Sequence, residues 1–113
     1  KWKPQVVALS GNTDCYQPVE KKKQLTRRCL EVFLDFRNPV VIITKNHLVT
    51  RDIDLLAELA KYQCIGVTIS ITTLDTKLAS LMEPRASTPA AFLTCRYTCF
   101  TVPGPLPRPR EPP

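Results

Sequence analysis

The sequence VVIITKNHLVTRDIDLLAELAKYQCIGVTISIT (residues 40–72) predicts a strand, a helix and a second strand, in that order. Residues 40–43 form a short apolar run, and residues 44–51 form a polar loop. A helix is expected over residues 52–62, with Asp52 as its N-cap. Its buried stripe is expected to consist of Leu55, Leu56, Leu59 and Ala60. The strand over residues 65–72 alternates apolar with small polar side chains. This order is typical of a βαβ unit with parallel strands.

The same plan extends toward the amino terminus. Residues 5–9 (QVVAL) are apolar on both faces, which predicts a strand buried on both sides, and the turn-forming residues 10–12 end it. A helix is expected over residues 23–37, and Asn38 and Pro39 end it. Its apolar stripe, expected to face the sheet, consists of Leu25, Cys29, Val32, Phe33 and Phe36. Its charged side, expected to face water, consists of Lys23, Arg27, Arg28, Glu31 and Asp35.

Toward the carboxyl terminus, a short helix is expected to begin near Asp75 and to end at Glu83 and Pro84. Its apolar residues are Leu78, Leu81 and Met82. Residues 1–91 therefore predict an α/β domain of about three parallel βα units. After residue 91 the periodic pattern stops, and residues 92–113 form an unrelated proline-rich tail that is expected to be disordered. Such a tail can also serve as a ligand for an aromatic groove in a partner.

The composition limits the classes of protein. A chain of 113 residues forms one domain at most, which excludes a complete large enzyme fold. Its 16 Lys and Arg against 10 Asp and Glu give a formal charge of +6, but the positive excess over residues 1–91 is only four. Charge therefore does not force non-specific nucleic-acid binding. The apolar runs are far shorter than the roughly 20 residues of a membrane span, and there is no signal-peptide pattern. Five cysteines, an odd number, favour a reducing, cytoplasmic compartment.

Polar side chains follow each predicted strand. In a parallel βα arrangement, ligands bind beyond the carboxyl ends of the strands, so these loops are expected to share one rim. The polar residues there include Ser10, Asn12, Thr13, Asp14, Glu20, Thr44, Lys45, Asn46, His47, Thr68, Ser70, Thr72 and Thr73. The set suits a polar ligand that carries an amine, a carboxylate and sugar hydroxyls. The same residue types also cap helices, and the two interpretations stand at even weight.

Other candidate sites are weaker. His47 has no second metal-type side chain beside it in the sequence, which favours an ordinary loop histidine. The run Lys21, Lys22 and Lys23, with Arg27 and Arg28 after it, either contacts phosphate or forms the solvated side of a helix. Cys95 and Cys99 have metal-like spacing, but no third or fourth ligand follows at a suitable distance. There is no glycine-rich nucleotide-binding motif.

At the strand ends the chain resembles the radical S-adenosylmethionine enzymes of the spore photoproduct lyase-like group, also described as DNA repair photolyase-like. The resemblance spans residues 6–91. It is carried by the segments LSGNTDCYQP (9–18), LTRRCLE (25–31), FRNP (36–39), ITKN (43–46), RDIDLL (51–56), VTISITTLD (67–75) and EPRA (83–86). A series of segments in this order is more specific than any one of them.

The resemblance implies a partial (βα)6 barrel that binds S-adenosylmethionine and a [4Fe-4S] cluster, with reductive cleavage to a 5′-deoxyadenosyl radical. It places the loop Ser10, Gly11, Asn12, Thr13 and Asp14 where the superfamily meets the methionyl amino group. It places Lys45 and Ser70 where related lyases contact the carboxylate and ribose of S-adenosylmethionine. Arg85 is a further candidate for the carboxylate. Nucleic acid is the substrate class that the name of the group suggests.

The chain departs from this group in two places. The three-cysteine CxxxCxxC motif that holds the cluster is absent, and the proline-rich tail replaces the further βα units. We therefore expect an internal fragment with part of the cofactor pocket, no metal ligands, no activity alone and a tendency to self-associate through open sheet edges. The alternative is a small non-enzymatic α/β module that binds partners through its basic helix or proline-rich tail.

Overall fold

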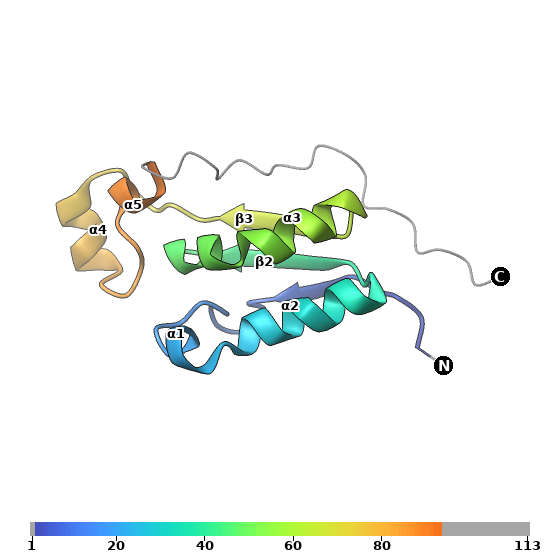
Figure 1. Cartoon of the computed structure of the whole chain (residues 1–113). Helices are drawn as coiled ribbons and strands as arrows, with labels where there is room; N and C mark the ends of the chain where they lie inside the picture. Colours follow the sequence, from blue (N-terminus) through green and yellow to red (C-terminus); the bar gives the residue numbers. More distant parts are fainter. Residues whose placement is uncertain (1, 94–113) are drawn as a thin grey trace.

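A computed structural model describes residues 2–93, and the side chains up to residue 91. In Figure 1 the long helices lie across one face of a three-stranded sheet. The elements are β1 (Val7–Leu9), α1 (Glu20–Lys23), α2 (Leu25–Phe36), β2 (Val40–Thr44), a 3-10 helix (His47–Asp52), α3 (Ile53–Lys61), β3 (Ile65–Ile69), α4 (Thr76–Met82) and α5 (Pro89–Leu93). None of the helices in this part of the chain is long and apolar enough to cross a membrane.

The strands form one parallel sheet in the order β1-β2-β3. Val7 pairs with Val40 and Val40 with Ile65, so the three strands begin at the same level. Helices α2 and α3 lie side by side on one face of the sheet (Figure 1). Consecutive parallel strands with crossovers of one hand place their helices on one side, as in βα barrels. The predicted α/β class and parallel sheet are confirmed.

The core lies between the sheet and these two helices. Val40 and Ile42 of β2 point toward α2 and α3, where Leu30 and Leu59 meet them. The remaining members of the core are Tyr16, Val49, Leu56, Cys64 and Ile65. The expected stripe of α3 is confirmed, with Leu56 and Leu59 buried and Leu55 and Ala60 packed against the core. Among the described residues nothing covers the opposite face of the sheet, where Ala8, Ile43 and Thr68 are exposed.

The expected stripe of the helix over residues 23–37 is largely wrong. Its buried side chains are Thr26 and Leu30, while Leu25, Cys29, Val32 and Phe36 are exposed. Phe33 is half-buried against the core, as expected. The helix is also interrupted, because Gln24 adopts a left-handed conformation (φ 50°) between α1 and α2.

Three smaller expectations are corrected. The first strand is shorter than expected and lies at the edge of the sheet, with Ala8 exposed, so it is not buried on both sides. The loop after β2 contains the 3-10 helix, and the third strand ends at Ile69 rather than at residue 72. The helix near Asp75 is confirmed, and the Asp75 carboxylate caps it by accepting from Lys77 N and Leu78 N. Residues 94–113 of the expected tail lie outside the described residues.

Candidate functional site

Asp14 joins the loop after β1 to the end of β2. Its carboxylate accepts hydrogen bonds from the Thr44 hydroxyl (2.8 and 3.0 Å), from the Lys45 backbone N–H (2.8 Å) and from the Tyr16 backbone N–H (2.8 Å). Thr44 is buried and is the last residue of β2. Since four contacts already occupy its two oxygens, Asp14 holds the rim together at the carboxyl edge of the sheet.

Lys45 follows β2 directly and reaches Glu83, the residue that follows α4. Its Nζ forms an ion pair with Glu83 Oε1, and Glu83 Oε2 accepts a 2.7 Å hydrogen bond from the Thr72 hydroxyl. The hydrogen bonds from Lys45 and then Thr72 lower the pKa of Glu83. The Lys45 side chain is 42% exposed. A cation at the carboxyl edge is thus balanced by one carboxylate and stays open to solvent.

Two hollows meet at this ion pair. The larger, of about 360 Å³, is lined by Thr13, Asp14, Tyr16, Gln17, Pro18, Lys45, Asn46, Glu83, Pro84, Arg85 and Ala86. The smaller, of about 100 Å³, is lined by Lys45, Ser70, Ile71, Thr72, Thr73, Ala79, Ser80, Glu83, Pro84, Ala86, Ser87, Thr88 and Pro89. Lys45 and Glu83 border both, so a ligand in either hollow would meet the same ammonium and carboxylate.

The structure brings together most of the residues expected at the rim. Thr13, Asp14, Lys45 and Arg85 line the larger hollow, and Ser70 lines the smaller one with Lys45. Ser10, Gly11 and Asn12 line neither. Ser10 instead adopts a left-handed conformation (φ 77°), and its hydroxyl accepts a 3.0 Å hydrogen bond from the Cys15 N–H, which shapes the turn.

Two site residues were not identified from the sequence. Glu83 was assigned to the end of a helix and to the segment EPRA of the resemblance, without a contact in the site, and Ser87 received no role. Ser87 fastens the segment after α4 to the β2 loop: its N–H donates to the Lys45 carbonyl (3.1 Å) and its hydroxyl accepts from the His47 N–H (2.7 Å). No local pattern signals these contacts, because they join residues about forty positions apart.

A buried ionic network lies beneath the rim. Arg51 binds the Asp52 carboxylate through two nitrogens (2.8 Å each) and donates to Glu20 Oε1 (2.9 Å) and the Glu20 carbonyl (3.0 Å). Arg27 adds a 3.0 Å contact to Asp52, and Tyr16 donates its hydroxyl to the same carboxylate at 3.1 Å. Asp52 is fully buried and Glu20 almost so. The network joins the loop after β1, α2 and the start of α3.

This network overturns two expectations. Asp52 makes no capping hydrogen bond to α3, because its carboxylate is turned to Arg51 and Arg27. Arg27 does not simply face water, since it pairs with Asp52 and, through two nitrogens, with Asp54. Burial would raise the pKa of Asp52, but hydrogen bonds from Arg51 and Arg27 outweigh it and lower that pKa. The pKa of Glu20 is lowered in the same way, because hydrogen bonds from Arg51 and from the backbone of α2 outweigh its burial.

The described residues offer no place for a metal cluster. Within residues 2–93, no three His, Cys, Asp or Glu side chains stand together as metal ligands. Cys29 is exposed on α2, Cys64 is buried before β3, and burial raises the pKa of the Cys15 thiol. Cys95 and Cys99 lie outside the described residues. The residues present therefore do not fit a [4Fe-4S] cluster.

Several proteins named only as uncharacterized are similar to this chain. ORF301 of Acidianus two-tailed virus is 41% identical over 93 residues, which are 82% of this chain and 30% of ORF301. Rv2578c of Mycobacterium tuberculosis is 34% identical over 92 residues (81% of this chain, 27% of Rv2578c). MJ0683 of Methanocaldococcus jannaschii is 36% identical over 78 residues (69% of this chain, 29% of MJ0683).

The chain spans under a third of the length of these relatives. No protein-family model matches it. No solved structure matches it either.

Proposed function

We propose that this chain supplies part of the S-adenosylmethionine pocket of a radical S-adenosylmethionine enzyme in the spore photoproduct lyase-like group. The proposal rests on the resemblance in sequence together with the polar rim at the carboxyl edge of a parallel sheet. In such an enzyme the bound cofactor supplies a 5′-deoxyadenosyl radical, and the protein binds and orients it. Nucleic acid is the substrate class that the resemblance suggests.

The observation that carries the proposal is the position of Lys45 between the two hollows. An ammonium group is a suitable partner for the carboxylate of an amino-acid ligand. Ser70 lies in one hollow and Arg85 in the other, so a hydroxyl donor and a second cation accompany Lys45. A ligand carboxylate would take the place that the Glu83 carboxylate holds beside Lys45.

The iron–sulfur cluster has no ligands among the described residues, so no chemical step is assigned to this chain through it. Anaerobic reconstitution with iron and sulfide is expected to leave the purified chain without a stoichiometric [4Fe-4S] cluster. Stoichiometric cluster uptake with cleavage of S-adenosylmethionine would contradict the proposal that this segment holds only the cofactor pocket.

The pocket itself is tested by equilibrium dialysis of the chain with radiolabelled S-adenosylmethionine. We expect saturable binding that Lys45→Ala weakens about tenfold and that Ser70→Ala weakens less. Lys77→Ala on α4 is the matched control, because it removes one positive charge from a residue that lines neither hollow. If the chain does not bind, or if Lys45→Ala binds as tightly as the parent, this pocket is not the site.

A further inference from the structure

The outer side of α2 carries an apolar stripe without cover among the described residues. Leu25 is 55% exposed, Val32 53% and Phe36 71%, and Cys29 is exposed as well. Their spacing of four, three and four residues places them in one line along the helix. The core uses a different line of α2, so this stripe does not contribute to the fold that the structure shows.

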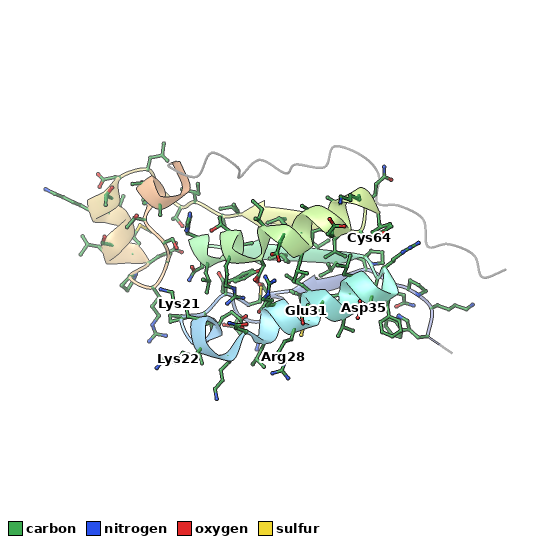
Figure 2. All side chains as sticks on the ribbon, in the orientation of Figure 1. Lys21, Lys22, Arg28, Glu31, Asp35 and Cys64 are labelled. Atoms are coloured by element: carbon green, nitrogen blue, oxygen red, sulfur yellow. The ribbon has the colours of Figure 1, made fainter. Side chains whose placement is uncertain are left out.

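The stripe points away from α3. Arg27 binds Asp52 and Asp54 at the start of α3, so the side of α2 that carries residue 27 faces that helix. At 100° per residue, Leu25 and Cys29 lie on roughly the opposite side from Arg27. Figure 2 shows Arg28, a neighbour of the stripe, on the side of α2 away from α3. The stripe therefore borders the space beside β1.

Strand β1 presents an open edge to the same space. Among the described residues it pairs with β2 alone, and the Val7 N–H donates to the Pro39 carbonyl on that side at 3.0 Å. In a parallel strand the bonded neighbour alternates from residue to residue, so the N–H and C=O of Ala8 point to the open edge. An open strand edge beside an apolar helix side is a surface that favours pairing with another chain.

We propose that a second copy of this chain occupies the surface, independently of the proposed function. A two-fold axis perpendicular to the sheet would place the two β1 strands antiparallel at Ala8 and the two α2 helices side by side. Each α2 connects β1 to β2 and so lies over that strand pair. The two helices would then be two strand spacings apart, about 9.6 Å, which is within the range for packed helices.

The centre of the stripe and residue Ala8 lie at about the same level along the strand direction. The Asn38 side chain donates to the Gln5 carbonyl (2.8 Å), so the end of α2 lies level with Gln5. Ala8 is three residues further along the strand, about 10 Å. The midpoint of the stripe, between Leu30 and Glu31, lies about the same distance from the end of α2. One axis can therefore pass through Ala8 and through the centre of the stripe.

Charges beside the stripe are complementary under this symmetry. Arg28 and Asp35 flank it on the solvent side, near its two ends, and Figure 2 labels both on α2. Neither takes part in a salt bridge within residues 2–93. An antiparallel pair of α2 helices brings Arg28 of one copy near Asp35 of the other, twice in one dimer. Two-fold interfaces are self-complementary in this way.

Sedimentation velocity of the full chain over a range of concentrations tests the proposal. We expect a monomer–dimer equilibrium whose dissociation constant rises at least about tenfold in Val32→Asp and in Phe36→Asp, because each would bury a carboxylate in an apolar contact. Leu81→Asp on α4 is the matched control, since Leu81 is 82% exposed and lies away from α2. Far-UV circular dichroism confirms that each variant is folded.

Charge reversal tests the arrangement itself. Arg28→Glu is expected to weaken the dimer, and the double variant Arg28→Glu/Asp35→Arg to restore it, because the pair is then reversed in both copies. A chain that stays monomeric at every concentration overturns the proposal. So does a dimer that Phe36→Asp leaves intact, because its interface would lie elsewhere. A dimer that the double reversal does not restore overturns the antiparallel geometry.

Discussion

The Tyr16 hydroxyl donates a 3.1 Å hydrogen bond to the Asp52 carboxylate, and neither side chain is accessible to solvent. The two residues are 36 positions apart, one in the loop after β1 and the other at the start of α3. A buried carboxylate is tolerated when its oxygens have several donors, and here Arg51 and Arg27 supply the others.

Tyr16→Phe is expected to lower the free energy of unfolding by about 1–2 kcal/mol, because it removes one hydrogen bond to a buried charge and keeps the ring. Urea denaturation measures the change. Tyr62→Phe is the control: the Tyr62 ring lies against Arg37 at 4.4 Å and is 43% exposed, so loss of its hydroxyl is expected to change stability by under about 0.5 kcal/mol. Equal effects of the two changes would argue against the network.

Stability is expected to fall in acid because of Glu20 and Asp52. Their pKa values are lower in the folded protein than in the unfolded chain, so folding is favoured by their ionised forms. This contribution is present above the unfolded values, near about pH 4, and is lost as the pH falls through the lower folded values.

Urea midpoints measured between about pH 7 and pH 3 would show the decline. Asp52→Asn is expected to flatten the acid side of the profile while lowering stability at neutral pH, because Arg51 and Arg27 lose their charged partner. Glu58→Gln, at an exposed carboxylate of α3 whose pair with Lys61 lies on the surface, is expected to keep the parent profile. An unchanged acid limb in Asp52→Asn contradicts this assignment.

Asp14→Ala is expected to lower the free energy of unfolding by about 2 kcal/mol, because the Thr44 hydroxyl and the Lys45 N–H lose their acceptor. The same change should weaken any ligand binding that depends on Lys45, since the position of its backbone is then less restricted. Glu58→Ala removes an exposed carboxylate whose pair with Lys61 lies on the surface, and it serves as the control in urea denaturation. A stable Asp14→Ala variant would show that the rim does not need this bridge.

Gln63→Gly is expected to stabilise the protein by up to about 1 kcal/mol. Gln63 has φ 55° at the end of α3, where its N–H donates to the Ala60 carbonyl and the Cys64 N–H to the Leu59 carbonyl. Glycine adopts this conformation without the steric penalty of a side chain. Lys61→Gly, at the last residue of α3, is expected to destabilise the protein instead, because glycine has a low helix propensity. Thermal unfolding measures the stability of both variants, and destabilisation by Gln63→Gly would contradict the argument.

The alternation of strands and helices could be predicted from the sequence, because apolar runs and helical periods are local properties. The buried side of α2 could not be predicted, because the helix carries two apolar lines. One contains Leu25, Cys29, Val32 and Phe36, and the other contains Leu30, Phe33 and Leu34. Periodicity alone does not say which line faces the sheet. The side of α2 that faces α3 carries Arg27, which forms ion pairs with Asp52 and Asp54. These pairs join residues that are distant in the sequence.

The position of the candidate site could be predicted from the sequence, but the contacts within it could not. The carboxyl ends of the strands located Asp14, Lys45 and Ser70 at one rim, because parallel strands end at a common edge. The partner of Lys45 was not predictable, since Glu83 reaches it only through the way the segment after β3 folds back. Glu20 was placed among the rim carboxylates, whereas the structure buries it at the amino end of α2.

The contacts of Glu20 affect how the first turn of α2 unfolds locally. Its carboxylate accepts hydrogen bonds from the backbone N–H groups of Leu25, Thr26 and Arg27, and Arg51 donates to the same carboxylate. The first turn of a helix ordinarily frays and exchanges its amide protons rapidly with water. Because Arg51 holds the accepting carboxylate in place, we expect these protons to be released when the contact with Arg51 is also broken. The amide protons of Leu25 and Thr26 should therefore exchange together with the segment around Arg51, as one cooperative unit.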